Sequence, residues 1–409
     1  MPREPTRHTD DATGLSIVVG GPLYRACMRA RLLRPQVDLP ERRVLAVLLI
    51  AWVPLAVLSI VEGHAFSGVA VPFFTQLTAQ TRYLIALPLL VIAEVVVHHR
   101  IVAAVGEFTD RGIIAPEDRP RFEQIIAAAV RLRDSRWVEA ILVLLAYTVG
   151  YWLWKRYVAM HTTTWYAAGG YDTPLTAAGY WHIFISMPLF RFLMMRWYFR
   201  LLVWYWFLWR VSRLPLHLNA LHPDRAGGLG FLNLAAFSFS PFLLAQTVLT
   251  AGKIGDRILQ QGAALPHFRL EIVSIIVGLM LLTYLPLLFF TFHVARTRRA
   301  GHREFGAFAA RYVDAFRAKW IAPEPATPTA PDALPGPAAL RESPLGTSDI
   351  QSLADLSNSY NIIREMGATP IEPRVAARLA ILITLPLTPL ILTMIPLDEL
   401  IERLLRLLI

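Results

Sequence analysis

The chain of 409 residues contains a single cysteine, Cys27. One cysteine excludes an internal disulfide and any metal site built from several cysteines. The sequence also lacks the GK[ST] ending of a P-loop and the HExxH pattern of zinc enzymes. No nucleophile, base and orienting residue stand together in it. We therefore expect no cofactor and no metal site, and we favour a binding or transport role over an enzyme.

Charged residues are also scarce. They make up 17% of the chain, whereas hydrophobic residues make up 55%, and soluble domains carry about 25% charge. The mean hydropathy is +0.45. The net charge of +10 comes almost entirely from arginine, because only Lys155, Lys253 and Lys319 are lysines. This bias is typical of GC-rich bacterial genomes.

The basic surplus does not indicate nucleic acid as a partner, because no motif that reads a groove is present. Membrane proteins keep arginine and lysine in cytoplasmic loops, where these residues meet anionic lipid headgroups. We therefore expect a lipid bilayer with anionic headgroups to be the partner, and we leave a homo-oligomer open.

Seven apolar runs have roughly the length, about 20 residues, that a helix needs to cross a bilayer. They predict an all-α polytopic membrane protein with about seven transmembrane helices, at 44–61, 83–99, 137–154, 180–209, 232–251, 271–294 and 376–396. The fourth run exceeds one crossing and contains no turn signal, so we predict one continuous helix that projects into the cytoplasm.

The basic residues between these runs predict the orientation. The segments on the side of the N-terminus contain 26 lysines and arginines, and the segments on the opposite side contain 8. Because basic loops stay in the cytoplasm, we expect a bacterial inner-membrane protein with a cytoplasmic N-terminus. With seven crossings the C-terminus is periplasmic.

The predicted organisation has four parts. An N-terminal cytoplasmic segment spans 1–43. Transmembrane helices one to six span 44–296 and include a cytoplasmic helical loop at 100–136. A second cytoplasmic loop spans 297–375, with a proline-rich linker at 322–346 and a helical stretch that begins near Ser348 and Asp349. The last part, 376–409, contains helix seven and a C-terminal amphipathic helix, which we place at the membrane surface; a coiled-coil or oligomer contact is the alternative for that helix.

The most distinctive short segment is HPDRAGGLGF at 222–231, between the fourth and fifth runs. Three glycines within four positions allow a tight turn that exposes backbone N–H groups, which can bind an anion. The candidate residues for anion or ligand binding are His222, Asp224, Arg225, Gly227, Gly228 and Gly230. A rigid turn between two helices is the competing interpretation, and a catalytic His–Asp pair is the third.

Two blocks of the sequence carry a resemblance. WFLWRVSRLPLHLNALHPDRAGGLGFL resembles a block found in a family of uncharacterised bacterial multi-pass membrane proteins. SLADLSNSYNIIREMGATPIEP, followed by a proline-rich last span, is similar to a second block of the same proteins. That family has no assigned activity. The resemblance therefore implies a bacterial inner-membrane protein and transfers no functional residue.

Glu94 and Arg191 are two of the charges that fall inside predicted transmembrane helices. Glu94 lies eleven residues after Tyr83, and Arg191 lies eleven residues after Tyr180, which places both at about 16 Å below the outer face. Buried charges in a membrane usually pair or face water. We predict a pair between Glu94 and Arg191, with Arg196 as the next partner. The alternatives are a static salt bridge, a residue of an ion or proton pathway, and a Glu94 that reaches the cytoplasmic side.

Proline, hydroxyl and amide groups interrupt the last three predicted helices, as in transporters. We therefore predict a channel or transporter with a pathway built from helices four to seven, lined by Arg191, Gln246 and Thr388. One alternative is a sensor or assembly protein that engages a partner through its cytoplasmic helices, 100–136 or 348–366. The other is a membrane enzyme that acts on a phosphorylated or lipid-linked substrate at the HPDRAGG turn.

Overall fold

The computed structural model of the chain describes residues 15–18, 20, 40–153, 163–168, 175–321 and 348–394. Most of the predicted N-terminal segment, the proline-rich linker and the C-terminal amphipathic helix lie outside these residues. The described part is all-helical, as the apolar runs predict. Its only β-type pairing is a set of isolated bridges at Val71, Thr164 and Ala167. The chain divides into two compact units, 1–215 with 231–286 and 372–409, and 216–230 with 287–371.

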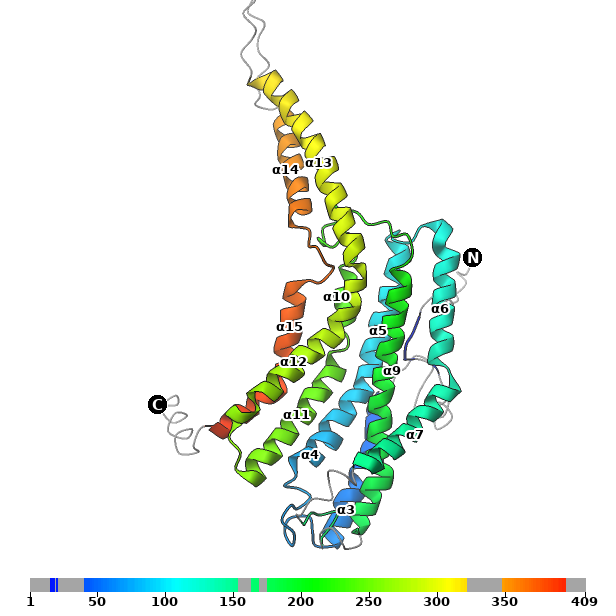
Figure 1. Cartoon of the computed structure of the whole chain (residues 1–409), viewed down its shortest axis with the longest axis vertical. Helices are drawn as coiled ribbons and strands as arrows, with labels where there is room; N and C mark the ends of the chain where they lie inside the picture. The colour runs from blue at the N-terminus through cyan, green and yellow to red at the C-terminus, as the bar shows by residue number, and fades with distance from the viewer. Residues whose placement is uncertain are drawn as a thin grey trace, which may run out of the picture. The chain divides into compact units, whose positions relative to one another are not determined.

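The first unit begins with the helices of the first half of the chain. In chain order they are α2 (Pro40–Ala51), α3 (Val53–Val61), α4 (Leu77–Gln80), α5 (Leu87–Asp110), α6 (Arg119–Arg133), α7 (Arg136–Leu153), α8 (Ala177–Trp181) and α9 (Met187–Val211). Figure 1 shows α5 and α9 as long neighbouring helices, with α6 and α7 beside α9. The fourth predicted run is one uninterrupted helical stretch from Ala177 to Val211, as its lack of turn signals predicts.

Two π-helical turns interrupt the regular α-helix in this unit. They are η1 (Thr81–Ala86) and η4 (His182–Ser186), and each precedes a proline, Pro88 and Pro188. A proline has no N–H to donate to the carbonyl four residues earlier. The local loss of that hydrogen bond favours the wider turn, which explains why both turns come just before the proline.

The first unit is completed by helices from the second half of the chain: α10 (Phe231–Phe237), α11 (Ser240–Gln261), α12 (Arg269–Tyr284), α15 (Pro373–Thr384) and the 3₁₀ segment η7 (Leu385–Met394). Their shared core contains Ile254, Phe268, Leu387 and Leu390. Asp256 of α11 accepts hydrogen bonds from the N–H groups of Leu77 and Thr78 at 2.7 and 2.9 Å. This contact caps α4 with a carboxylate from a distant part of the chain.

The second unit contains α13 (Thr291–Trp320) and α14 (Ser348–Glu365), which lie side by side in Figure 1, together with the loop 216–230. Helix α14 confirms the helical stretch predicted after the linker. Helix α13 was not predicted, because its sequence is too polar to stand out as an apolar run. The two helices and the loop meet at Gly301, where an added Cβ would lie 2.6 Å from the Cβ of Ala220 and 3.4 Å from Ile363.

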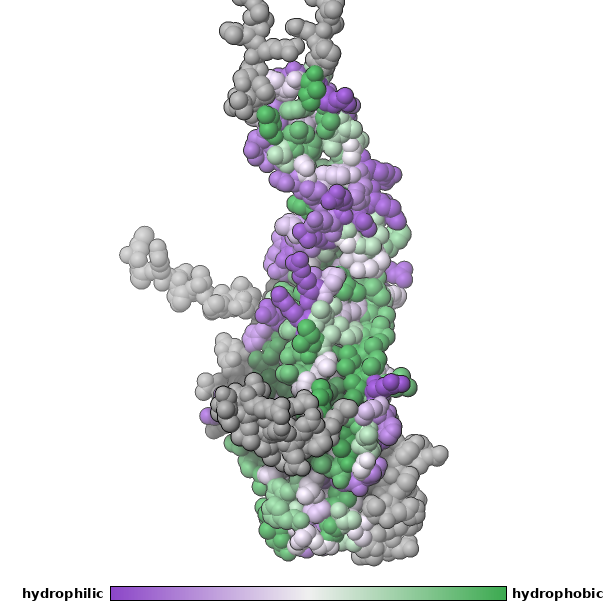
Figure 2. All heavy atoms as spheres, turned by 90° about the vertical axis from the view of Figure 1, so that its left-hand side faces the viewer, coloured by the Kyte–Doolittle hydropathy of each residue, from purple (hydrophilic) through white to green (hydrophobic). Residues whose placement is uncertain are grey.

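Five helical stretches are long and apolar enough to cross a membrane: Glu41–Val61, Leu77–Asp110, Phe231–Gln261, Leu265–Trp320 and Pro373–Leu392. They contain predicted runs one, two, five and six, and most of run seven. Large apolar side chains on them are exposed, for example Leu270 at 77% and Ile381 at 73%. Figure 2 shows exposed hydrophobic residues, in green, on the surface of the first unit. Hydrophilic residues, in purple, cover much of the α13–α14 pair. These helices indicate an integral membrane protein.

The count of seven crossings stays a prediction. Runs three and four are helical, as α7 and as the α8–α9 stretch, but they are not among the five apolar stretches. Helix α9 carries four arginines, Arg191, Arg196, Arg200 and Arg210, which lower its hydropathy. Composition alone therefore does not identify α9 as a membrane span.

Candidate functional site

Glu94 lies on the inner face of α5, among apolar residues such as Leu90, Val91 and Val97. It is 4% exposed. Removing a carboxylate from water is costly unless it is paired and hydrogen-bonded. The side chain of Glu94 must therefore be balanced by groups from neighbouring helices.

Three arginines from two other helices provide that balance. Arg43 in the first turn of α2 donates a hydrogen bond to Oε2 of Glu94. Arg200 of α9 places Nη2 at 2.7 Å from Oε1, and Arg196, one helical turn earlier, places Nη1 at 3.6 Å from the same oxygen. All three arginines are less than 9% exposed. We call Glu94 and these arginines, together with Glu139 of α7 beside Arg196, the Glu94 cluster.

The Glu94 cluster has more positive than negative charge. Glu139 of α7 is the second carboxylate in reach, with Oε1 at 3.7 Å from Nε of Arg196. Within the described residues, three guanidinium groups then face two carboxylates, so one positive charge is in excess. The Nη1 atoms of Arg43 and Arg200 are buried and, within the described residues, have no hydrogen-bond partner. A buried donor without a partner costs about 1–3 kcal/mol, and an anion is the group that satisfies it best.

A short N-terminal segment packs beside the Glu94 cluster. Residues 15–18 are buried, Oγ of Ser16 lies 2.7 Å from Nδ1 of His98, and Arg133 of α6 donates to the carbonyl of Ser16. Arg196 donates to the carbonyl of Gly20 at 3.4 Å. This contact was not predicted from the sequence, although the apolar run LSIVV in an otherwise polar N-terminus is a signal that could have indicated it.

The predicted pair between Glu94 and Arg191 is wrong. In the described structure the ion pairs of Glu94 go to Arg43, Arg196 and Arg200, and the second-choice partner Arg196 is confirmed as a contact. The prediction assumed that α5 and α9 start at the same level. Their register is instead set by packing, since Nε1 of Trp197 donates to the carbonyl of Leu90 at 2.9 Å. This contact places Arg200, one helical turn after Trp197, beside Glu94, one helical turn after Leu90.

The predicted depth of Glu94 also needs correction. Arg43 is the third residue of the first apolar stretch, Glu41–Val61. A carboxylate that pairs with Arg43 is level with the beginning of that stretch rather than with its middle. In the predicted orientation this position is the cytoplasmic end, so the interpretation in which Glu94 is near the cytoplasmic side is the closest to the structure.

Gln246 and Thr388 do not join this cluster in the described structure. Nε2 of Gln246 lies 2.7 Å from Sδ of Met194, which links α11 to α9. Thr388 is exposed, and its hydroxyl donates to the carbonyl of Leu385 in its own helix at 2.7 Å. Neither position supports a common pathway lining with Arg191, and the helices that hold the Glu94 cluster are α2, α5, α7 and α9 instead of the predicted helices four to seven.

The HPDRAGG turn is closed by its own carboxylate. Asp224 accepts hydrogen bonds from the N–H groups of Ala226, Gly228 and Gly230 at 2.9, 3.1 and 2.8 Å. Gly227 and Gly228 have φ values of 72° and 102°, which glycine adopts without strain. The carboxylate of Asp224 thus takes the place that an external anion would take at these three N–H groups.

The two other charged residues of the turn are also engaged. Nδ1 of His222 lies 2.9 Å from Oδ1 of Asp224. Arg225 forms an ion pair with Glu365 at the end of α14, at 2.7 Å, and its carbonyl accepts from Gly367 at 3.0 Å. These contacts favour the rigid-turn interpretation. The anion site and the catalytic His–Asp pair at this turn stay predictions that the geometry does not support.

Comparison with known proteins adds no family. No protein-family model, no curated protein and no solved structure matches this chain. Among the residues that the structure describes, no three side chains of the metal-binding types gather into a group. The Glu94 cluster is therefore the candidate functional site.

Proposed function

We propose that this chain is a multi-pass protein of a bacterial inner membrane that binds and transports a small anion, as a channel or a transporter. The Glu94 cluster is the proposed anion site. The observation that carries the proposal is the surplus positive charge of the cluster, together with the two buried Nη1 atoms of Arg43 and Arg200 that have no partner in the described residues.

The charge of the cluster fits transport better than a purely structural role. A salt bridge that only fixes packing would balance its charges, because each uncompensated buried charge is costly. Arginines in pores select anions. Glu94 competes with an incoming anion for the same arginines, which keeps anion binding weak enough for release. The proposed pathway runs between α2, α5, α7 and α9, since these helices carry the cluster.

The same cluster supports seven crossings. Arg196 and Arg200 of α9 are buried against Glu94 rather than exposed to lipid, so a criterion based on composition undercounts this helix. We propose α7 and the α8–α9 stretch as the third and fourth spans, with a cytoplasmic N-terminus. Membership of the uncharacterised bacterial family that the two sequence blocks resemble is part of this proposal.

The test is anion flux into proteoliposomes that contain the purified protein and a halide-sensitive dye. We expect chloride or bromide influx well above that of empty vesicles. Arg200→Gln is expected to reduce the flux at least tenfold, Arg200→Lys to retain part of it, and Arg311→Gln on the exposed surface of α13 to leave it unchanged. Gel filtration checks that each variant is folded. Halide influx no greater than that of empty vesicles, together with no uptake of radiolabelled phosphate or sulfate, would contradict the proposal.

A second candidate function has one observation in its favour. The hydrophilic α13–α14 pair exposes large apolar side chains, including Phe308 at 49%, Val313 at 40% and Ile350 at 45%. Such exposed groups suit a sensor or assembly protein that engages a partner. Replacing Phe308 and Ile350 by serine separates the two functions. If the protein transports anions, the flux of this double variant should be unchanged. If it binds a partner, the double variant should fold normally but lose the cellular phenotype of the wild type, and Arg200→Gln should keep that phenotype.

A further inference from the structure

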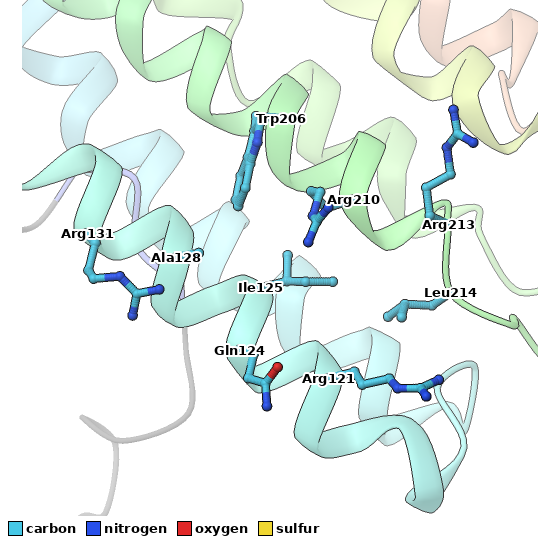
Figure 3. A pocket seen from close by; sticks show the side chains of 9 residues that line it. All are labelled: Arg121, Gln124, Ile125, Ala128, Arg131, Trp206, Arg210, Arg213 and Leu214. Atoms are coloured by element: carbon cyan, nitrogen blue, oxygen red, sulfur yellow. The ribbon is translucent and has the colours of Figure 1, made fainter.

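A solvent-accessible groove lies between α6 and the C-terminal part of α9, within the first unit. Its volume is about 420 Å³. The polar side chains that line it are Arg121, Gln124 and Arg131 from α6, Arg210 from the end of α9 and Arg213 just after it, with Trp206 of α9 beside them. Figure 3 shows Trp206 and Arg210 extending from α9 toward α6. We call this the arginine groove.

The arginine groove is strongly positive. Four of its lining residues are arginines and none is an aspartate or glutamate. Arg121 pairs with Asp118 of the preceding turn at 3.1 Å. Within the described residues, no ion pair with a carboxylate is found for Arg131, Arg210 or Arg213. Arg131 of α6 and Arg210 of α9 therefore offer guanidinium groups from two helices to one ligand, whereas the guanidinium of Arg213 lies 5.3 Å from the ring centre of Trp209 and extends away from α6 in Figure 3.

The groove is separate from the Glu94 cluster. Trp206 follows Arg200 by six residues, which turns it about 240° round α9 at about 100° per residue. The Glu94 cluster is buried, whereas Arg121, Arg131, Arg210 and Arg213 are exposed. An anion in the groove would therefore be a second ligand and not the transported one.

The side chains favour a phosphate group. Guanidinium groups bind phosphate oxygens with two parallel hydrogen bonds, and several arginines can share the three oxygens of one phosphate. The guanidinium of Arg210 lies 5.8 Å from the ring centre of Trp206, a cation–π distance that holds it in place. Tryptophan is also typical of the membrane–water interface, the level at which lipid phosphates lie.

We propose that the arginine groove binds a phosphate-bearing ligand, supplied either by the headgroup of an anionic phospholipid or by a soluble phosphate compound. This inference goes beyond the proposed anion transport and does not depend on it. It also goes beyond the general attraction of basic loops for anionic lipid, because it assigns one site to named residues of two helices.

The test measures ligand-induced stabilisation of the purified protein in a neutral detergent. Dioleoyl phosphatidic acid, dioleoyl phosphatidylcholine and inorganic pyrophosphate are titrated separately, and the unfolding temperature is recorded. A ligand that binds only the folded state raises this temperature. We expect phosphatidic acid or pyrophosphate to raise it, and phosphatidylcholine to have no effect. Stabilisation by the lipid alone identifies a headgroup site, and stabilisation by pyrophosphate identifies a soluble ligand.

Variants assign the effect to the groove. Arg131→Gln with Arg210→Gln is expected to weaken binding at least tenfold. Arg303→Gln with Arg311→Gln on α13 removes the same charge from exposed positions and is expected to leave binding unchanged. An equal loss in both double variants would overturn the proposal, because it would show attraction by overall charge. Absence of stabilisation by both phosphate ligands would overturn it as well. If the groove variant unfolds, Arg210→Lys, which keeps the charge but not the planar fork, is the substitute and is expected to weaken binding.

Discussion

Glu94 holds the proposed anion site together, because its two carboxylate oxygens contact three arginines from α2 and α9. Within the described residues, removing this carboxylate leaves three buried positive charges with Glu139 as their one nearby carboxylate. We therefore expect the loss of Glu94 to affect folding as well as the proposed anion binding.

Glu94→Gln is expected to destabilise the protein by about 3–5 kcal/mol, the usual cost of an uncompensated buried charge. Glu107→Gln on the same helix breaks the partly exposed pair with Arg111 and should cost less than about 1 kcal/mol. Thermal unfolding in detergent compares the two. Added bromide should restore part of the stability of Glu94→Gln only. Similar losses in both variants would show that the cluster is not tightly coupled.

Gly230 tests the rigid-turn interpretation of the HPDRAGG segment. A Cβ at this position would lie 2.8 Å from Cβ and 2.9 Å from Oδ2 of Asp224. Gly230→Ala should therefore lower the unfolding temperature by displacing the carboxylate from its three N–H donors. Gly306→Ala in α13 is the control, because nothing lies within 4 Å of its added Cβ, and alanine stabilises a helix by about 0.5–1 kcal/mol relative to glycine. A Gly230→Ala protein as stable as wild type would argue against a closed turn.

The sequence revealed some residues of the site and not others. Glu94 and Arg196 stood out as charges inside apolar runs. Arg200 could have been found as well, because it follows Arg196 by four residues and so shares its helix face. Arg43 could not have been found, since no pattern in the chain indicates that α2 packs against α5. Its position at the edge of the first run made it look like part of the cytoplasmic segment.

At the scale of secondary structure, one aspartate links the ends of α13 and α14. Asp349 accepts hydrogen bonds from Nζ of Lys319 at 2.7 Å and from Nε1 of Trp320 at 3.1 Å. The sequence pattern places Asp349 near the start of α14, and the structure shows its side chain bound to α13. The hydrogen bonds from Lys319 and Trp320 lower the pKa of the Asp349 carboxyl from its ordinary value.

This shift predicts a pH dependence. A carboxyl whose pKa is lower in the folded than in the unfolded state stabilises the fold above the unfolded pKa, about 3.9, and this stabilisation is lost as the pH falls through the folded pKa. The protection factors of the amides in the second turn of α14, which correct exchange rates for their intrinsic pH dependence, should therefore fall below pH 4 in the wild type. Asp349→Asn should show lower protection at pH 7 and a smaller change on acidification. The same loss of protection in both proteins would contradict the role of Asp349.

The helices themselves were largely predictable, because long apolar runs and proline-free amphipathic stretches determine them. The first and last residues of the helices were less predictable. The helical stretch made of α4, the π turn η1 and α5 begins at Leu77 and ends at Asp110. It extends well beyond the predicted run 83–99 at both ends. The apolar run identifies only the hydrophobic part of the helix. The helix itself extends as far as contacts with neighbouring helices stabilise it.

At the scale of the whole molecule, the apolar helices indicate an integral membrane protein. The distribution of basic residues predicts the orientation of this protein in the membrane. The loop between α5 and α6 is expected in the cytoplasm, and the end of α11 is expected on the outer side. Glu117 and Gln261 are exposed residues in these two regions and can each be replaced by cysteine after Cys27→Ser.

A membrane-impermeant maleimide applied to intact cells should label Gln261→Cys, because this position is predicted to face the periplasm. It should label Glu117→Cys only after the membrane is permeabilised. The reverse pattern would show the opposite orientation. Labelling of both positions in intact cells would mean that the loop 111–118 and the end of α11 are on the same side, which seven crossings do not allow.

Anion binding at the Glu94 cluster is tested most directly by the anomalous diffraction of bromide in crystals of the protein grown or soaked in bromide. We expect an anomalous peak inside the bundle within hydrogen-bonding distance of Nη1 of Arg43 or Arg200, and its loss in Arg200→Gln crystals under the same conditions. Well-ordered density in which both Nη1 atoms bind protein groups, with no bromide peak beside them, would contradict an anion site and leave Glu94 as a structural ion pair.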